Sequence, residues 1–331
     1  MKSSVLIVGG GPAGMLLAYL FREHGIDYRL LERGKIAQAW RAMRPGMVLL
    51  SPAVPGTDWT SLTLRHPIWA LPGVRRPFPT REDFLCYVEG FAHEHALNVV
   101  ENSAVARITV VPGGFVAYAT EGEESCRFIV LATGASAMAT FPDIPGIAGN
   151  RYVVHSCDFV NCAAYAGKSV LVIGGGNSAA EIAIELAGTA TVTLCTRGPM
   201  RYFSETGDLE HIRGSSESVL KELARFGIIR LRENDPAVSV ADRRVRFGSG
   251  EEHEYDWILC ATGYRPKTIP LEGGDLRVDT EGYPVISGVG ETTVPGLYVC
   301  GSLARFNRRC AFIHGFRNYV EKAFWDIADR L

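Results

Sequence analysis

The chain has 331 residues, of which 47% are hydrophobic and 21% charged, so it is long enough for about two domains of ordinary globular composition. Its formal net charge of −2 gives no electrostatic reason to expect nucleic acid or an acidic membrane surface as a partner. The apolar run at residues 5–8 is too short for a signal peptide, and no apolar run of about 18 residues follows. We therefore expect a cytoplasmic protein whose partners are small molecules.

A glycine-rich turn near the N-terminus is the first motif. Residues 5–8 predict a buried strand, residues 15–23 predict a helix, and Gly9, Gly11 and Gly14 between them have the spacing G-x-G-x-x-G. The first glycine allows a tight turn, the second lets the backbone approach a pyrophosphate, and the third lets the helix pack closely on the strand. The next strand, residues 28–32, ends in Glu32, where an acid is expected to accept ribose hydroxyls. The stretch therefore predicts a dinucleotide site.

An aromatic insertion, residues 36–90, takes the place of the next expected helix. It contains Trp40, Trp59 and Trp69 together with seven prolines. Structured loops of this length are uncommon unless they serve a function, and aromatic side chains suit a planar ring. The alternative is that the tryptophans only pack the loop onto its domain.

A helix start and a run of strands follow. Thr80 and Asp83 have the spacing of a capping box, and apolar residues from 84 to 91 continue the helical pattern. Residues 98–101, 104–111, 114–120 and 127–131 predict four strands, of which the last closes in Ala-Thr-Gly at Thr133 and Gly134.

The same pattern begins again after Pro145. A strand at 168–173 precedes Gly174, Gly176 and Ala179 in the spacing G-x-G-x-x-A, then a helix at 180–187 and a strand at 192–195. That strand ends in Thr196-Arg197 instead of an acid. An arginine here accommodates a 2′-phosphate, so the second site should prefer NADPH to NADH. The alternative is that Arg197 is a solvated surface charge.

The two copies predict the fold class. A strand at 256–260 closes in a second Ala-Thr-Gly at Gly263, and a last strand before Gly301 leads to an amphipathic helix at 312–331. We expect an α/β fold with two Rossmann-like dinucleotide-binding domains. The NADPH domain, 156–267, would be inserted into an FAD domain made of residues 1–155 and 268–331.

Together these motifs resemble flavoproteins with two dinucleotide-binding domains, a class that includes thioredoxin reductases, flavin-containing monooxygenases and their small bacterial relatives. The resemblance covers nearly the whole chain. Within it, several segments are similar to the bacterial monooxygenase-like branch, namely Trp40-Arg41 and residues 49–52, 78–82, 154–156 and 312–315.

The resemblance implies two cofactors, with a hydride passing from the nicotinamide of NADPH to FAD. For FAD it implies Gly9, Gly11, Gly14 and Glu32, with Trp40 and Arg41 nearby. For NADPH it implies Gly174, Gly176, Asn177, Ser178, Ala179 and Arg197. Further candidate cofactor contacts in the same motifs are Pro12, Ala13, Arg33, Thr133, Gly134, Thr196, Gly263, Gly301, Ser302, Phe312 and Ile313.

Three residues are candidates for the catalytic chemistry. His66 and His314 lie in segments expected to approach the flavin, and histidine titrates near neutral pH, which suits general acid–base work. The alternative for each is a histidine that merely hydrogen-bonds a loop. Ser51 stands where flavin-containing monooxygenases have an asparagine near the flavin.

Departures from the family patterns leave more than one function open. The monooxygenase fingerprint F-x-G-x-x-x-H keeps His155, but Gly149 and Arg151 stand where its Phe and Gly would fall. The Asp that follows the last strand's glycine in thioredoxin reductases is Ser302 here.

The first interpretation is an NADPH-dependent monooxygenase. It would oxidise a small organic substrate at nitrogen, sulfur or carbonyl with molecular oxygen, through a flavin hydroperoxide. The alternative is a flavin-dependent disulfide or quinone reductase without a C-x-x-C pair. Bacillithiol-disulfide reductases carry a cysteine where this chain has Ala13, so Cys157 and Cys162 would be the remaining pair.

A third interpretation is a binding module that performs no turnover. The cysteine spacings predict no metal site, and exposed edges of the aromatic insertion would allow a homodimer.

Overall fold

A computed structural model describes residues 3–331, which form two compact units. Unit 1 consists of the chain up to Met138 together with residues 265–331, and unit 2 consists of residues 139–264. The chain leaves unit 1 within β9 (Met138–Ala139) and returns within β18 (Tyr264–Arg265). No helix in the described part of the chain is long and apolar enough to cross a membrane.

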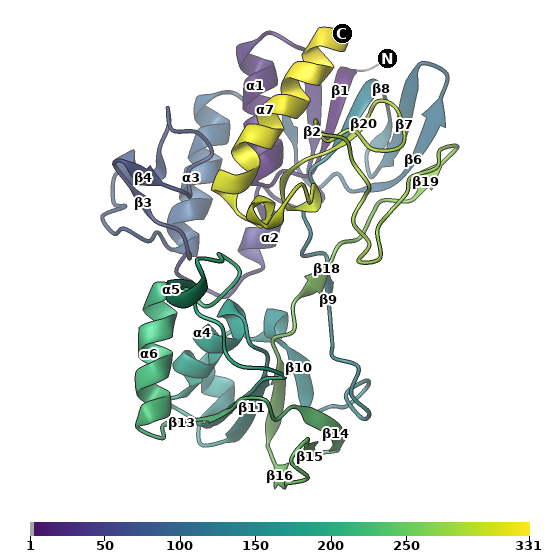
Figure 1. Cartoon of the computed structure of the whole chain (residues 1–331). Coiled ribbons are helices and arrows are strands. Elements are labelled where there is room, and N and C mark those ends of the chain that lie inside the picture. The colour runs from purple at the N-terminus through teal and green to yellow at the C-terminus, as the bar shows by residue number, and fades with distance from the viewer. Residues whose placement is uncertain (1–2) are drawn as a thin grey trace. The chain divides into compact units, whose positions relative to one another are not determined.

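Unit 1 is built on an eight-stranded sheet in which β1 lies between β8 and β2 (Figure 1). The order is β19-β6-β7-β8-β1-β2-β5, with β20 also paired to β8. The pairs β6–β7 and β7–β8 are antiparallel and the others are parallel. The bounds are β1 Ser3–Val8, β2 Tyr28–Leu31, β5 Val99–Val100, β6 Val105–Val111, β7 Gly114–Ala119, β8 Gly122–Leu131, β19 Leu271–Glu272 and β20 Leu297–Val299.

Both faces of β1 are buried, which explains its uninterrupted apolar sequence. Val5 and Ile7 belong to the core packed against α1, α3 and α7, whereas Leu6 and Val8 belong to the core on the other face of the sheet. The helices α1 and α7 also contact each other, so they lie side by side over the sheet (Figure 1). The helices of unit 1 are α1 Pro12–Glu23, α2 Gln38–Arg41, α3 Arg81–Glu94 and α7 Ile313–Arg330, with 3-10 turns η1 Ile68–Ala70, η4 Gly301–Leu303 and η5 Arg308–Ala311.

Unit 2 repeats the architecture on a smaller scale. Its five-stranded parallel sheet has the order β10-β17-β11-β12-β13. Val170 and Val172 of β11 face one core, and Leu171 and Ile173 face the other. The strands are β10 Val153–His155, β11 Ser169–Ile173, β12 Thr191–Cys195, β13 Ile229–Arg232 and β17 Trp257–Cys260.

Further elements complete unit 2. An antiparallel sheet of three strands consists of β14 Ala237–Ala241, β15 Arg244–Phe247 and β16 Glu252–Glu254. The helices are α4 Asn177–Leu186, α5 Phe203–Thr206 and α6 Gly214–Arg225, with 3-10 turns η2 Ser156–Asp158 and η3 Cys162–Tyr165. The sequence motifs predicted no elements between residues 198 and 255, where α5, α6 and β13 to β16 occur.

The α/β fold class with two Rossmann-like units is confirmed. The capping box at the start of α3 is also present, because Thr80 accepts a hydrogen bond from the Asp83 N–H while the Asp83 carboxylate accepts one from the Thr80 N–H. The first expected boundary, residue 155, differs from the structure. Residues 139–155 belong to unit 2 because β10 pairs with β17.

Candidate functional site

The first glycine turn connects β1 to α1 and has room only for glycine at two positions. Gly9 has φ +113°, and a Cβ on it would lie 2.5 Å from the Ala132 carbonyl oxygen. A Cβ on Gly14 would lie 2.0 Å from the Gly9 carbonyl oxygen. A Cβ on Gly11, in contrast, would have no heavy atom of the described residues within 4 Å apart from those of Gly11 and its chain neighbours. The turn is therefore tight on its inner side and open at Gly11, as a pyrophosphate requires.

The start of α1 faces the same opening. Gly11 is the N-cap, Pro12 follows it, and within residues 3–331 no side chain caps the helix. The first turn also has no acidic residue. The first-turn N–H groups and the positive end of the helix dipole are thus free to bind an anion, which fits the diphosphate of FAD.

Glu32, at the end of the second strand, is hydrogen-bonded to the backbone of the turn. The Glu32 residue is 6% exposed, and its carboxylate accepts hydrogen bonds from the Gly10 N–H (Oε2, 2.7 Å) and the Gly34 N–H (Oε1, 3.0 Å). These two bonds fix the carboxylate while leaving it further lone pairs for ribose hydroxyls. The neighbouring Arg33 is exposed.

Two further glycine turns of unit 1, at Gly134 and Gly301, lie close to the first one. A Cβ on Gly301, which has φ +73°, would lie 2.7 Å from the Ala13 Cβ. The Ala135 N–H, next to Gly134, donates to Ser302 Oγ at 3.1 Å. The ends of β1, β8 and β20 therefore converge, and they bring together predicted cofactor contacts that are almost 300 residues apart in sequence.

The start of the aromatic insertion touches the first turn through its backbone. The Ala37 N–H donates to the Gly10 carbonyl oxygen at 2.9 Å. Trp40 packs its ring on Phe84 with a centroid separation of 4.2 Å, and Arg41 pairs with Glu89. Both side chains thus fasten α2 to α3, which supports the packing interpretation for Trp40.

Farther along the insertion, Trp59 lies against the start of α7. Its ring stacks on His314 with centroids 4.9 Å apart and an interplanar angle of 30°. Arg317 Nη2 also donates to the Asp58 carbonyl oxygen at 2.6 Å, and burial lowers the Arg317 pKa. The sequence analysis did not predict Arg317. The only signal for it in the sequence is its position one helical turn after His314.

Ser51 lies in the same neighbourhood as Trp59. The Ser51 carbonyl oxygen accepts a hydrogen bond from Thr60 Oγ1 at 2.9 Å, and the Trp59 N–H donates to the Pro52 carbonyl oxygen, also at 2.9 Å. The fold therefore brings two predicted catalytic residues, Ser51 and His314, close to one tryptophan.

His66, the third predicted catalytic residue, lies elsewhere. Its ring contacts Tyr19 at a centroid distance of 5.9 Å and His95 at 4.4 Å. Tyr19 is about 10 Å along the α1 axis from Pro12, given the usual rise per residue. The structure thus places His66 beside the later part of α1, apart from the first glycine turn.

The second glycine turn, between β11 and α4, has the same geometry. Gly174 has φ +151°, and a Cβ on it would lie 2.4 Å from the Ala261 carbonyl oxygen and 3.2 Å from the Ala179 Cβ. A Cβ on Gly176 would have no heavy atom in the described part of the chain within 4 Å apart from those of Gly176 and its chain neighbours. Gly176 is also the N-cap of α4, and Ser178 in the first turn is exposed. The turn therefore fits a second dinucleotide.

The polar residues around the second turn include one that the sequence did not predict. Asn177 Oδ1 accepts from the Arg213 N–H at 2.9 Å, which fixes the Arg213 backbone beside the turn. Arg213 is 6% exposed, and burial lowers its pKa. Thr196 is buried and donates from Oγ1 to the Gly198 carbonyl oxygen at 2.5 Å, whereas Arg197 is exposed.

His155 and Gly263 are joined at the same carboxyl edge of the unit 2 sheet as the second glycine turn, because His155 and Ile173 both pair with Cys260. His155 is fully buried, donates from Nε2 to the Gly263 carbonyl oxygen (3.1 Å), and accepts at Nδ1 from the Cys157 N–H (3.2 Å). Burial lowers the His155 pKa, so the ring is neutral at pH 7. These contacts describe a structural histidine.

The cysteines offer no prepared redox pair. Within residues 3–331 all eight are free, and burial raises the pKa of Cys157. Cys162 donates instead to the Glu185 carbonyl oxygen at 3.1 Å. Cys300, adjacent to Gly301, is buried, and its pKa is raised to about 12.

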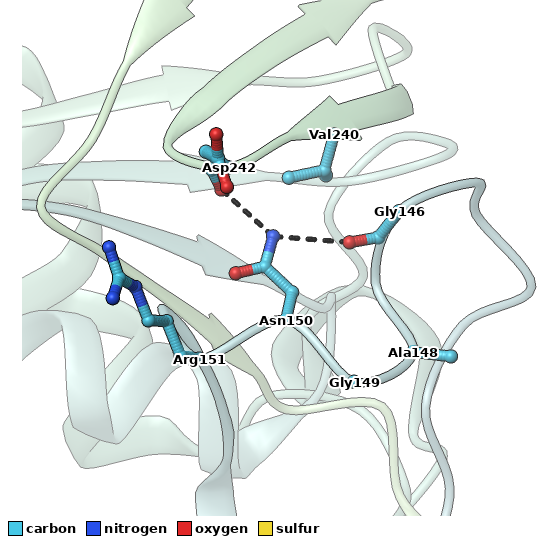
Figure 2. Close-up of a pocket in the computed structure, with 7 residues that line it drawn as sticks. All are labelled: Gly146, Ala148, Gly149, Asn150, Arg151, Val240 and Asp242. Atoms are coloured by element: carbon cyan, nitrogen blue, oxygen red, sulfur yellow. Dashed lines mark hydrogen bonds between the residues drawn. The ribbon is translucent and has the colours of Figure 1, made fainter.

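A recess of about 360 Å³ lies in unit 2 beside the loop at 146–151 (Figure 2). The Asn150 side-chain amide donates hydrogen bonds to the Gly146 and Asp242 carbonyl oxygens, and Arg151 donates one to the Tyr152 hydroxyl. The recess is lined by none of the residues of the two G-x-G motifs, so we assign it no chemistry.

Comparisons with known proteins agree with this geometry. The pyridine nucleotide-disulphide oxidoreductase family matches residues 6–301. The indole-3-pyruvate monooxygenase YUCCA4 of Oryza sativa is 32% identical, over 92% of this chain and 83% of its own length. An uncharacterized CzcO-like oxidoreductase of Geobacillus kaustophilus is 25% identical, over 98% of this chain and 97% of its own.

Solved structures show the same fold. A variant of the flavin monooxygenase from Stenotrophomonas maltophilia has a TM-score of 0.85 and 25% identity, covering 99% of this chain and 98% of that one. The bacillithiol disulfide reductase Bdr from Staphylococcus aureus has a TM-score of 0.86 and 22% identity, covering 100% of this chain and 99% of that one. At 22% identity the likeness to the latter shows the fold alone.

Proposed function

Since the chain belongs to the pyridine nucleotide-disulphide oxidoreductase family and is an FAD-dependent oxidoreductase, we propose that it is an NADPH-dependent monooxygenase. Its substrates are a small organic molecule, oxidised at nitrogen, sulfur or carbonyl, and molecular oxygen. Support comes from the monooxygenase relative that is 32% identical over 92% of the chain.

We assign FAD to unit 1 and NADPH to unit 2. In unit 1 the open side of Gly11 and the N–H groups of α1 would hold the diphosphate, Glu32 the ribose, and the Gly134 and Gly301 turns would line the site. In unit 2 the Gly176 turn would hold the NADPH diphosphate, with Arg197 or Arg213 on the 2′-phosphate. When bound, FAD accepts a hydride from NADPH and supplies the reducing power for oxygen.

The single observation that carries the monooxygenase assignment is the stack of Trp59 on His314. It joins the aromatic insertion to the start of α7, next to the segment that follows Gly301. An aromatic layer there would exclude water from the flavin, which a monooxygenase needs so that oxygen reaches the substrate rather than being released as peroxide. His314 would hold or move a proton at an imidazole nitrogen, and Ser51 would orient substrate.

The thiol groups do not support a disulfide reductase. Such chemistry needs an accessible thiolate. Cys300 is buried with a pKa of about 12. Cys157 is exposed, but its raised pKa reduces the share of thiolate. Ala13 occupies the position in the first glycine turn where a cysteine would be needed.

A stopped-flow experiment tests the proposal. The flavin-bound protein is reduced with NADPH without oxygen and then mixed with aerated buffer while the flavin spectrum is recorded. A long-lived species absorbing between reduced and oxidised flavin supports the monooxygenase, and amines, thioethers and ketones are then screened for oxygenated product. Direct return to oxidised flavin, with peroxide as the sole product for every substrate, contradicts it and favours a quinone reductase.

A further inference from the structure

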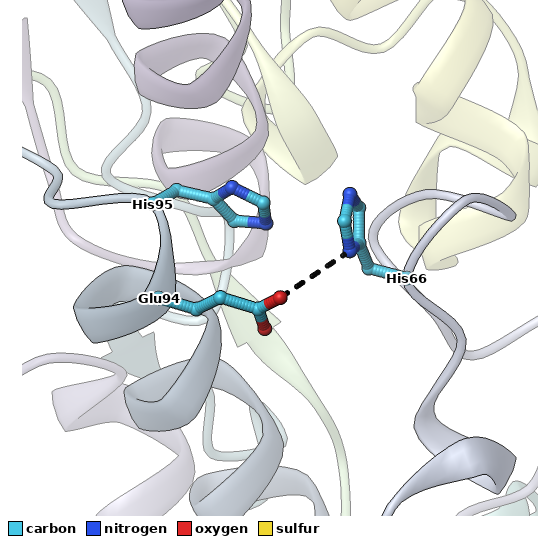
Figure 3. Close-up of side chains that lie close together, drawn as sticks. All are labelled: His66, Glu94 and His95. Atoms are coloured by element: carbon cyan, nitrogen blue, oxygen red, sulfur yellow. Dashed lines mark ion pairs between the residues drawn. The ribbon is translucent and has the colours of Figure 1, made fainter.

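Three metal-ligating side chains from two segments meet at the end of α3. His66 comes from the aromatic insertion, Glu94 is the last residue of α3, and His95 follows it (Figure 3). One donor atom from each lies within 4.8 Å of the other two, and His66 Nδ1 is 3.9 Å from Glu94 Oε1. None of the three belongs to either glycine turn.

The backbone around His66 is held firmly. The Tyr87 hydroxyl donates to the His66 carbonyl oxygen at 2.7 Å and accepts from the Leu62 N–H at 2.9 Å. Two residues later, the Ile68 N–H donates to Ser61 Oγ at 2.8 Å. These bonds fix the loop against α3, so His66 is presented to Glu94 and His95 by a structured segment.

His95 carries an unsatisfied polar atom. Its Nε2 is buried and has no hydrogen-bond partner in the described structure. The ring is enclosed by Tyr19 and Phe91, at centroid distances of 4.7 and 4.6 Å, and meets His66 edge-on at 77°. A buried polar nitrogen without a partner is unfavourable and calls for an explanation, such as a bound ion.

The donor set selects a class of ion. Two imidazole nitrogens and one carboxylate oxygen suit Zn²⁺ and similar transition metals, whereas Ca²⁺ and Mg²⁺ prefer oxygen ligands alone. A tetrahedral Zn²⁺ with ligand distances of about 2.0–2.2 Å separates its ligands by about 3.3 Å. The three side chains must therefore approach one another slightly, and Glu94, 67% exposed, is free to move inward.

We propose that His66, Glu94 and His95 form a binding site for a divalent transition metal of the Zn²⁺ class. The ion joins the aromatic insertion to the end of α3, and a water molecule takes the fourth position. Because the ion binds the folded arrangement and not the unfolded chain, it stabilises the fold. The inference does not depend on the proposed function.

The test uses the full-length, flavin-bound protein without an affinity tag, stripped with EDTA and then freed of chelator. Zn²⁺ alone is titrated by calorimetry, and Co²⁺ alone is followed by its d–d absorption at wavelengths longer than those of the flavin. We expect one equivalent to bind with a Kd of about 1 μM or lower. We also expect Zn²⁺ to raise the Tm.

Variants locate the site. His66→Gln and His95→Gln should each weaken binding by more than the roughly 10–100-fold typical of losing an outer-shell partner, and should abolish the Tm increase. His93→Gln is the matched control, because His93 is exposed and lies at the same helix end. It should keep the wild-type Kd.

Two outcomes overturn the proposal. One is a wild-type protein that binds no Zn²⁺ below about 1 mM. The other is a Kd that is unchanged in both histidine variants. Far-UV circular dichroism and flavin content verify that each variant is folded, and His66→Gln decides alone if His95→Gln does not fold, since the His66 side chain is 32% exposed.

Discussion

Gly301, at the end of β20, lies directly against Ala13 in the first turn of α1. A Cβ added to Gly301 would be 2.7 Å from the Ala13 Cβ, and the φ of +73° disfavours any other residue. The contact fixes the last glycine turn of unit 1 to the first, so both sides of the proposed FAD site depend on it.

Gly301→Ala should therefore destabilise unit 1 and lower its FAD content. The left-handed backbone alone costs about 1–2 kcal/mol, and the clash adds about 1–3 kcal/mol. Gly25→Ala is the control, since Gly25 has φ +67° and a Cβ added to it would contact no heavy atom of residues 3–331 within 4 Å beyond Gly25 and its chain neighbours. Thermal unfolding and the ratio of bound FAD to protein measure both variants. Equal effects in the two variants would show that backbone strain, and not the Ala13 contact, causes the loss of stability.

Arg197→Ala should reduce the preference for NADPH over NADH. Loss of a charge-assisted contact worth about 1.5–3 kcal/mol predicts a rise of roughly 10–100-fold in KM for NADPH, with little change for NADH. Arg201→Ala, an exposed arginine four residues later, should leave both values unchanged. If only Arg213→Ala raises KM, the buried arginine holds the phosphate instead.

Trp59→Ala should increase the share of NADPH oxidation that ends in hydrogen peroxide. The reason is that removing the ring opens the layer over His314 to water. Peroxide and oxygenated product are quantified per NADPH consumed in the presence of a substrate. Trp325→Ala, a tryptophan 53% exposed on α7, serves as the control. An unchanged peroxide share in Trp59→Ala would contradict a water-excluding role.

Cys157 and Cys162 should prove dispensable. Because burial raises the Cys157 pKa, less thiolate is present at a given pH than for a free cysteine. Iodoacetamide should therefore alkylate Cys157 more slowly than free cysteine near pH 8, as mass spectrometry can follow. The double variant Cys157→Ser, Cys162→Ser should oxidise NADPH at the wild-type rate. A large loss of that rate would instead favour the disulfide reductase function.

His155 should make unit 2 less stable as the pH falls. Its folded-state pKa is lowered by burial, so between that value and the unfolded value of about 6.5 the unfolded chain binds more protons. The free energy of unfolding consequently decreases as the pH drops below about 6.5. Urea unfolding between about pH 7 and pH 5 measures the slope. His155→Gln should flatten it, and His93→Gln, at an exposed site, should not.

The sequence predicted the elements whose signals are local. The spacing of Gly9, Gly11 and Gly14 predicted the first turn, and Thr80 with Asp83 predicted the start of α3, because each depends on neighbouring residues. The strand ends at Gly134 and Gly301 were also visible. Elements without a motif, such as α6 and the strands β14 to β16, were not predicted, since their patterns carry no fixed spacing.

The amino-acid sequence by itself determined that this chain has two strand–glycine–helix units and the residue types that nucleotides require. Tertiary packing decided which distant side chains meet. It put Trp40 on Phe84, set Arg213 beside Asn177, and placed His66 with His95 rather than at the first turn. The physical reason is that these contacts form between segments whose relative position depends on the folded cores, which no local spacing records.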